Sequence, residues 1–205
     1  MLVTIEGIDG SGKSSLVLSL HTLLSDLSPV FTREPGSTWV GDQVRRAVAE
    51  KADPITEALL FAADHAAHLS TLVRPSLERG LLVISDRYSD SRYAYQQETL
   101  KGYIDDPLAW LRALHAGWTV CPDLTFLIVL PVDDALSRIK EKQNREHFEN
   151  HRLLNKVQDQ YLTLAKSDPS RFVLVDGTKD EGEIAGFVAG VIRDAFGRSQ
   201  SHRRP

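Results

Sequence analysis

The chain has 205 residues and a formal net charge of −4, a length that suits one α/β domain with a sizeable core. The acidic balance argues against a protein that coats nucleic acid, and a single cysteine, Cys121, excludes an internal disulfide framework and favours a reducing compartment. Because no apolar run reaches the ~18 residues of a membrane span and the chain begins with a predicted core strand, we expect a cytoplasmic protein with no membrane partner and no signal peptide.

The first predicted strand, residues 2–5, leads into a glycine-rich segment and then a helix with apolar spacing at 16–24. The segment, residues 7–14, matches G-x-x-x-x-G-K-[ST]. Its fixed positions are Gly7, Gly12, Lys13 and Ser14. Such a loop turns backbone N–H groups toward a phosphate, while its lysine reaches the outer phosphates and its hydroxyl binds Mg²⁺. We therefore expect a nucleoside triphosphate site here.

Two polar segments follow predicted strands farther along the chain. A Pro-Gly turn that carries Arg33 comes after the strand at 30–32, and Asp86 comes after the continuous apolar run at 81–84. A carboxylate at the carboxyl end of a central parallel strand lies where α/β folds bind ligands, so Asp86 is a candidate Mg²⁺ ligand. A helix N-cap is the alternative role for Asp86.

The rest of the pattern continues the alternation of strands and helices. A helix with Val48 on its apolar face is predicted to end near residue 50, residues 52–54 are predicted to break the chain, and a long helix is predicted over 56–73. Further helices are predicted to pass through 161–165 and to cover 93–100, 107–116, 132–140 and 183–196. Strands are predicted at 124–130 and 171–175. The whole predicts an α/β, three-layer P-loop NTPase fold, in which helices cover both faces of a five-stranded parallel sheet. We expect one domain over 1–196 and a flexible tail at 197–205.

A highly charged stretch without an apolar face occupies residues 140–146. It is either a solvated turn or, beside a triphosphate site, a closing and cation-bearing lid, which we place at about 140–150. A GTP-dependent switch is disfavoured, because the near match to its guanine motif at 155–158 lacks the acidic fourth residue. A compact phosphotransferase remains, with its acceptor near Arg33, Phe61 and Arg87.

Several short motifs, in order along nearly the whole chain, resemble the thymidylate kinase family. They are residues 5–14, Thr32-Arg33-Glu34-Pro35-Gly36, Leu60-Phe61-Ala62-Ala63-Asp64, Asp86-Arg87-Tyr88, Ala94-Tyr95-Gln96 and Pro122-Asp123-Leu124-Thr125. The resemblance implies transfer of the γ-phosphoryl of ATP to dTMP, giving dTDP, with Mg²⁺ and commonly in a homodimer.

The resemblance also implies roles for single residues on the dTMP side. Arg33 and Arg87 resemble residues around the acceptor phosphate and the transferring group, where a guanidinium binds oxygens bidentately. Asp9 resembles the carboxylate that takes the sugar 3′-hydroxyl, Phe61 the ring that stacks on thymine, and Tyr95 the ring that crowds the 2′ position. Core packing is the alternative for both rings. The predicted dTMP set is Asp9, Arg33, Phe61, His65, Arg87, Ser91, Arg92, Tyr95 and Gln96.

On the ATP side, the resemblance implies the phosphate loop and a turn beside the adenine. The set is Gly7, Ile8, Asp9, Gly10, Ser11, Gly12, Lys13, Ser14, Ser15, Arg138, Asp176 and Thr178, with Mg²⁺ on Ser14 and Asp86. Some family members carry a catalytic arginine directly after the position of Asp9. Gly10 stands there in this chain, so the lid is expected to supply that cation. Arg145 is the best candidate, with Lys142 and Lys140 beside it. The predicted catalytic set is Lys13, Arg33, Asp86, Arg87 and Arg145.

Two positions depart from the family pattern for base recognition. His65 stands where most relatives have Arg, and Arg92 where many have Ser, Thr or Asn. Either Arg92 reaches the base edge while His65 fills the space, or Arg92 points to solvent and His65 donates to a thymine carbonyl. Two other functions stay open: a related kinase of another pyrimidine, and an ATP-binding protein without catalysis.

Overall fold

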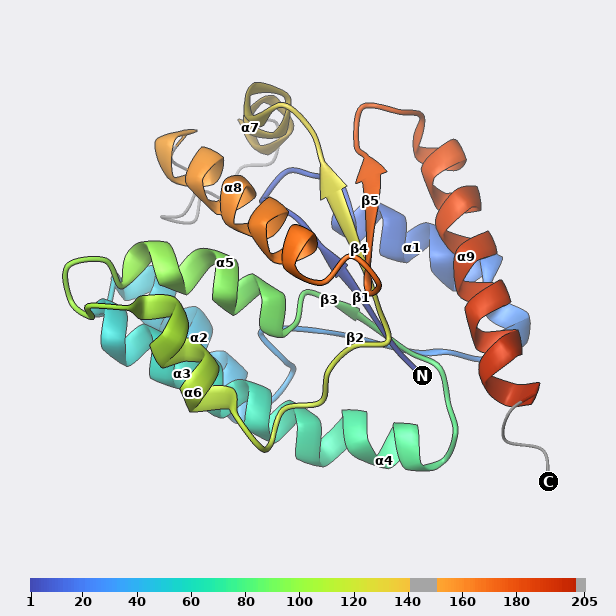
Figure 1. The fold of residues 1–205 in the computed structure, drawn as a ribbon, viewed down its shortest axis with the longest axis horizontal. Helices are drawn as coiled ribbons and strands as arrows, with labels where there is room; N and C mark the ends of the chain where they lie inside the picture. Colours follow the sequence, from blue (N-terminus) through green and yellow to red (C-terminus); the bar gives the residue numbers. More distant parts are fainter. Residues whose placement is uncertain (141–150, 202–205) are drawn as a thin grey trace.

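The protein is represented by a computed structural model that describes residues 1–140 and 151–201. At its centre lie five parallel strands in the order β2-β3-β1-β4-β5 (Figure 1). They are β1 (Leu2–Glu6), β2 (Val30–Arg33), β3 (Val83–Asp86), β4 (Leu124–Val129) and β5 (Phe172–Asp176). The predicted five-stranded parallel sheet is confirmed. The three inner strands are almost wholly buried, as their continuous apolar runs indicate.

Helices cover both faces of the sheet, as predicted. On one face, α1 (Lys13–Leu23) and α9 (Glu181–Ser201) form a buried apolar cluster with strand residues such as Ile5 and Phe126. On the other face, α5 (Ser89–Thr99) and α8 (His151–Ser167) pack side by side (Figure 1). The remaining helical elements are η1 (Ser25–Leu27), α2 (Trp39–Glu50), α3 (Pro54–His68), η2 (Leu69–Val73), α4 (Arg74–Glu78), α6 (Pro107–His115) and α7 (Val132–Lys140).

The helical segment after Asp53 is longer than the pattern predicts. The Asp53 carboxylate accepts hydrogen bonds from the N–H groups of Ile55 and Thr56, so Pro54 is the first residue of α3 rather than a break before it. The chain then passes through the π-helical turn η2, which ends at Val73, and stays helical beyond it in α4. At the other end of the molecule, α9 continues to Ser201 rather than ending at Phe196, so only residues 202–205 of the expected tail lie outside the described part of the chain.

The strand register brings three distant segments to one edge of the sheet. Ile5 of β1 is paired with Asp86 of β3, and Asp86 is paired with Arg33 of β2. Because parallel strands end at the same edge, the loop after β1 starts beside the polar end of β3, and the polar end of β2 lies one strand farther out. None of the described helices is long and apolar enough to cross a membrane.

Candidate active site

The phosphate loop lies between β1 and α1, where the sequence predicts it. Gly12 has a φ of +96° and is the N-cap of α1. Gly10 has a φ of +79°, and a Cβ atom on it would lie 2.2 Å from the carbonyl oxygen of Ala135 in α7. In this chain, the loop therefore packs too closely on α7 to carry a side chain at position 10.

Lys13 lies inside the loop. Its Nζ donates to the carbonyl oxygen of Ile8 at 2.7 Å and to the hydroxyl of Ser11 at 3.3 Å. Burial, and then the nearby guanidinium of Arg87, lower the pKa of Lys13 to about 8. A phosphate beside the ammonium group would favour its charged form again. The start of α1 is also where a helix favours an anion.

Ser14 and Asp86 meet at the edge of the sheet, as predicted for Mg²⁺ ligands. The Ser14 hydroxyl donates to Oδ2 of Asp86 at 3.0 Å. The other carboxylate oxygen, Oδ1, is buried and has no hydrogen-bond partner in the described part of the chain. Mg²⁺ prefers hard oxygen ligands and usually takes one or two from the protein, the rest coming from phosphates and water. The two side chains fit that ion. The N-cap alternative for Asp86 is wrong, because α5 starts at Ser89 with Tyr88 as its cap residue.

Arg87 joins the phosphate loop to α5. Its φ of +68° is unusual for a residue with a side chain. The guanidinium pairs with Asp9, and Nη1 donates to the carbonyl oxygen of Gly7 and the hydroxyl of Ser91, both at 3.2 Å. The hydroxyl of Tyr95 donates to Oδ2 of Asp9 at 2.9 Å. Burial alone would raise the pKa of Asp9, but Arg87 and Lys13 hold it below its usual value, so Asp9 is an ionised acceptor.

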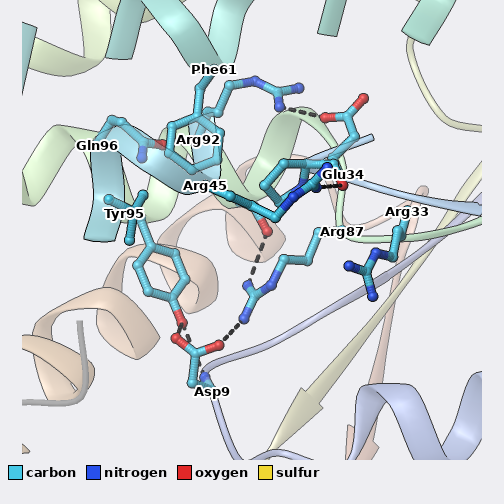
Figure 2. A pocket seen from close by; sticks show the side chains of 12 residues that line it. Asp9, Arg33, Glu34, Arg45, Phe61, Arg87, Arg92, Tyr95 and Gln96 are labelled. Atoms are coloured by element: carbon cyan, nitrogen blue, oxygen red, sulfur yellow. Dashed lines mark hydrogen bonds and ion pairs between the residues drawn. The ribbon is translucent and has the colours of Figure 1, made fainter. Parts of the chain in front are cut away.

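Most of the predicted dTMP-binding residues line one cavity. It is lined by Asp9, Arg33, Glu34, Pro35, Arg45, Val48, Phe61, Arg87, Ser91, Arg92, Tyr95 and Gln96. Figure 2 shows Arg33 and Arg87 approaching it from one side and Tyr95 and Gln96 from another. Phe61 lines the cavity and also packs against the apolar cluster that contains Tyr95. For both rings, core packing and cavity lining therefore occur together.

His65 is the predicted dTMP residue that does not line this cavity. Its Nδ1 lies 2.7 Å from Oε1 of Glu34 and its Nε2 lies 2.6 Å from the hydroxyl of Thr119. Arg92 is 2% exposed and pairs with the Glu34 carboxylate. The hypothesis that Arg92 points to solvent while His65 donates to thymine is therefore wrong. The four-residue spacing between Phe61 and His65 predicts that both lie on the same side of α3, but it does not predict the direction of the imidazole.

Several residues that line the cavity were not predicted from the sequence as dTMP-binding residues. Glu34 and Pro35 belong to the Arg-Glu-Pro-Gly turn, so that motif could have indicated them. Arg45 donates to the carbonyl oxygens of Gly36 at 3.0 Å and Pro35 at 3.4 Å, but nothing in its surroundings in the sequence marks it. Val48 was predicted only as a core residue of its helix.

Glu6 is a further missed residue, directly before the loop. It is fully buried and accepts hydrogen bonds from the Tyr88 N–H at 2.8 Å, the Ser91 hydroxyl at 2.6 Å and the Tyr161 hydroxyl at 2.9 Å. Burial, and then the charge of Asp90, raise the pKa of Glu6 to about 7. Glu6 thus ties β1 to the residues around Arg87 and to α8.

A second cavity borders the phosphate loop from the side of α9. It is lined by Ser11, Gly12, Ser15, Leu16, Ser19, Ile128, Arg138, Gly177, Lys179, Glu181 and Ile184. Arg138 donates to the carbonyl oxygen of Gly177 at 3.2 Å. Asp176 accepts from the N–H of Thr178 at 2.9 Å and from its hydroxyl at 2.6 Å. The predicted ATP residues Ser15 and Arg138 are therefore brought together, whereas Asp176 and Thr178 shape the turn without lining the cavity.

The predicted lid cations Arg145 and Lys142 fall in residues 141–150, outside the described residues. Lys140 is the last residue of α7.

Comparison with known proteins agrees with the geometry. A family model described as "Thymidylate kinase" matches residues 5–186. A protein of Methanoculleus marisnigri named "Probable thymidylate kinase" is 60% identical over 205 residues, which cover 100% of this chain and 99% of that protein. Proteins with the same name from Methanospirillum hungatei and Methanocorpusculum labreanum are 57% and 53% identical, over 96% and 94% of this chain and 95% and 98% of their own lengths. With its motifs, its parallel sheet and this match over almost the full length, the chain belongs to the thymidylate kinase family.

Proposed function

We propose that the protein transfers the γ-phosphoryl of ATP to dTMP, giving ADP and dTDP. The observation that carries the proposal is that two cavities share one phosphate loop, with Asp9 lining the first and Ser11 and Gly12 lining the second. The cavity with Phe61 and Tyr95 offers rings to a nucleoside, while the one with Ser15 and Arg138 borders the start of α1. A donor and an acceptor held in this way react as if in one molecule.

The charges fit phosphoryl transfer, in which positioning and electrostatic stabilisation matter more than a strong base. ATP and dTMP are both polyanionic and repel each other. This repulsion would be offset by the cationic side chains of Lys13, Arg33 and Arg87. We assign Arg33 and Arg87 to the dTMP phosphate and the transferring group, because a guanidinium can bind two phosphate oxygens at once. Lys13 serves the outer phosphates of ATP. We assign a further cation to Arg145 of the lid.

Ser14 and Asp86 would hold Mg²⁺, which neutralises charge on the β- and γ-phosphates when it is bound. Oδ1 of Asp86 has no hydrogen-bond partner among the described residues, which supports this assignment. On the nucleoside side, the ionised Asp9 would accept a hydrogen bond from the 3′-hydroxyl of the sugar. Tyr95, held against Asp9 by its hydroxyl, would crowd the 2′ position and favour deoxyribose.

Two alternatives remain to be separated from dTMP phosphorylation: transfer to another pyrimidine nucleotide, and ATP binding without transfer. ADP formation measured side by side with dTMP, dUMP, dCMP, dGMP and thymidine distinguishes them. We expect dTMP to be strongly preferred. Equal or faster turnover of dUMP or dCMP would assign a different acceptor, and no turnover with any acceptor would leave an ATP-binding protein.

The assembly and the location of the enzyme are part of the same proposal. We propose a homodimer in the cytoplasm; the single cysteine, Cys121, is free and exposed, which is compatible with a reducing compartment. Light scattering during size-exclusion chromatography tests the dimer. A mass near the 22.8 kDa of one chain at micromolar concentration would contradict it.

A further inference from the structure

A buried polar cluster lies directly behind the proposed dTMP cavity. Its centre is Glu34, which follows β2, and its other members come from α3, α5 and α6. They are His65, His68, Arg92 and His115, each no more than 2% exposed. Glu34 and Arg92 also line the cavity itself. The inference that follows rests on the proposed function, because it concerns how this cavity is shaped for dTMP.

Glu34 is satisfied by three donors. Oε1 lies 2.7 Å from Nδ1 of His65 and 2.7 Å from Nδ1 of His68, while Oε2 pairs with Nη1 of Arg92. Burial alone would raise the pKa of Glu34, but Arg92 and the two histidines hold it well below its usual range. Glu34 is therefore a carboxylate, and a buried carboxylate needs such partners.

Arg92 is the counter-charge of Glu34, and its guanidinium also contacts His115. Nδ1 of His115 lies 2.7 Å from the carbonyl oxygen of Leu111, which can only accept, so the ring proton is on Nδ1. Nε2 of His115 is then free to accept from Nε of Arg92 at 3.2 Å. Burial, and then Arg92, lower the pKa of His115 to about 4. The Glu34 carboxylate is thus paired with the Arg92 guanidinium, and His115 accepts from that guanidinium as a neutral ring.

Two of the three guanidinium nitrogens of Arg92 are used inside the cluster. Nε is used by His115, Nη1 is used by Glu34, and Nη2 is shielded from solvent and has no partner among residues 1–140 and 151–201. Arg92 therefore lines the cavity while its guanidinium is bonded to Glu34 and His115.

Glu34, in contrast, is covalently next to two residues that face the cavity, Arg33 and Pro35. The next positions of this segment are held separately. Asp64 accepts from the N–H of Gly36 at 2.7 Å, and Arg45 donates to the Gly36 carbonyl oxygen at 3.0 Å. The segment that presents Arg33 is thus fixed at Gly36 by α2 and α3, and at Glu34 by the buried cluster.

We propose that Arg92 is a positioning residue that acts through Glu34: by balancing the buried carboxylate, it holds the segment from Arg33 to Pro35 in the conformation that receives dTMP. Selectivity for the base would then come from the shape of the wall, not from a hydrogen bond between Arg92 and thymine.

A charge-balance cycle tests this role. Arg92→Met keeps the length of the side chain but leaves Glu34 without its counter-charge, and Glu34→Gln removes the carboxylate. We expect Arg92→Met to weaken dTMP binding, measured by titration calorimetry, at least about tenfold, and Glu34→Gln/Arg92→Met to recover most of that loss. Arg45→Met is the matched control, because Arg45 lines the same cavity and does not bind Glu34. Glu34→Gln should not rescue it.

Each outcome bears on the proposal. If the double variant binds dTMP no better than Arg92→Met, Arg92 contacts the nucleotide directly and the proposal is wrong. If the midpoint of thermal unfolding recovers while the Kd for dTMP does not, the cluster stabilises the fold only, which also overturns it. If Arg92→Met does not fold, the test compares Glu34→Gln with the double variant Glu34→Gln/Arg92→Met. The proposal predicts nearly equal Kd values for dTMP in these two proteins.

The failure of this inference is separable from that of the proposed function. Binding of dTMP is measured without turnover, so a parent protein that binds dTMP but does not phosphorylate it would overturn the proposed reaction and leave the cycle valid. A parent that does not bind dTMP would overturn both.

Discussion

At the scale of single residues, Lys13 is the cation that the phosphate loop holds in a fixed place, bonded to Ile8 and Ser11 inside the loop. We expect Lys13→Ala to lower kcat at least about 10²-fold, because a preorganised charge at the transferring phosphate is a large part of catalysis. Steady-state ADP formation with dTMP measures this.

The control for this variant is Lys166→Ala, an exposed lysine in the last turn of α8. It should turn over like the parent. Circular dichroism and thermal unfolding should report an intact fold for both proteins. A folded Lys13→Ala protein with near-normal turnover would remove Lys13 from the catalytic set.

Glu6 gives a prediction about stability and pH. Its pKa rises from 4.5 to about 7 in the folded protein. Between these values the folded state keeps a proton that the unfolded chain has lost, so this residue's contribution to stability is full below pH 4.5 and falls as the pH rises to about 7. The total loss corresponds to roughly 3 kcal/mol.

Glu6→Gln cannot titrate, so it isolates this effect. The free energy of unfolding of the variant minus that of the parent should increase from pH 4.5 to 7 and level off above. Urea unfolding at a series of pH values measures the difference. A difference that stays constant across this range would mean that Glu6 is ionised in the folded state throughout.

The family resemblance predicted which side chains line one site, but not how each is oriented. Asp9, Arg87 and Tyr95 were expected in one site and form one hydrogen-bonded group. His65 was expected in the same site, yet its imidazole turns to Glu34, because a buried carboxylate is a stronger partner than a solvated cavity. That preference depends on a residue in another element, which local spacing along α3 cannot reveal.

At the scale of elements, the lid that we propose at about 140–150 gives a prediction about catalysis. We expect Arg145→Ala to lower kcat by about 10³-fold or more while changing the Kd for dTMP far less, because a lid cation meets the phosphates mainly in the closed, reacting state. Single-turnover rates and equilibrium binding separate the two effects.

Lys142→Ala is the companion variant for this experiment. If it loses activity while Arg145→Ala is near normal, the catalytic cation lies on Lys142. The assignment of the lid as the source of the cation would then hold, but the residue would be wrong.

The elements themselves followed closely from apolar runs and helical spacing. Where the observed helix ends differ from the predicted ones, the cause is a local interaction that apolar spacing does not report. Pro54 looked like a break, but the Asp53 side chain caps the helix there. Val73 looked like a helix end, but a π-helical turn continues into α4 with Pro75 in its first turn.

At the scale of the whole molecule, the order of the strands assembles the site. The pattern of the chain predicted five parallel strands but not the order β2-β3-β1-β4-β5, since a local pattern predicts a strand and not its neighbours in the sheet. That order puts Arg33, Asp86 and the start of the phosphate loop at one edge. The clustering of these residues is therefore a property of the topology, and no single segment encodes it.

The most direct test of the central claim follows a labelled phosphoryl group. The protein is incubated with Mg²⁺, dTMP and ATP labelled at the γ-phosphoryl, and the nucleotides are separated. We predict that the label appears in dTDP, one equivalent for each ADP formed, and that Lys13→Ala abolishes most of it. Label that is released as inorganic phosphate, or that stays in ATP, would contradict the assignment of this site to phosphoryl transfer onto dTMP.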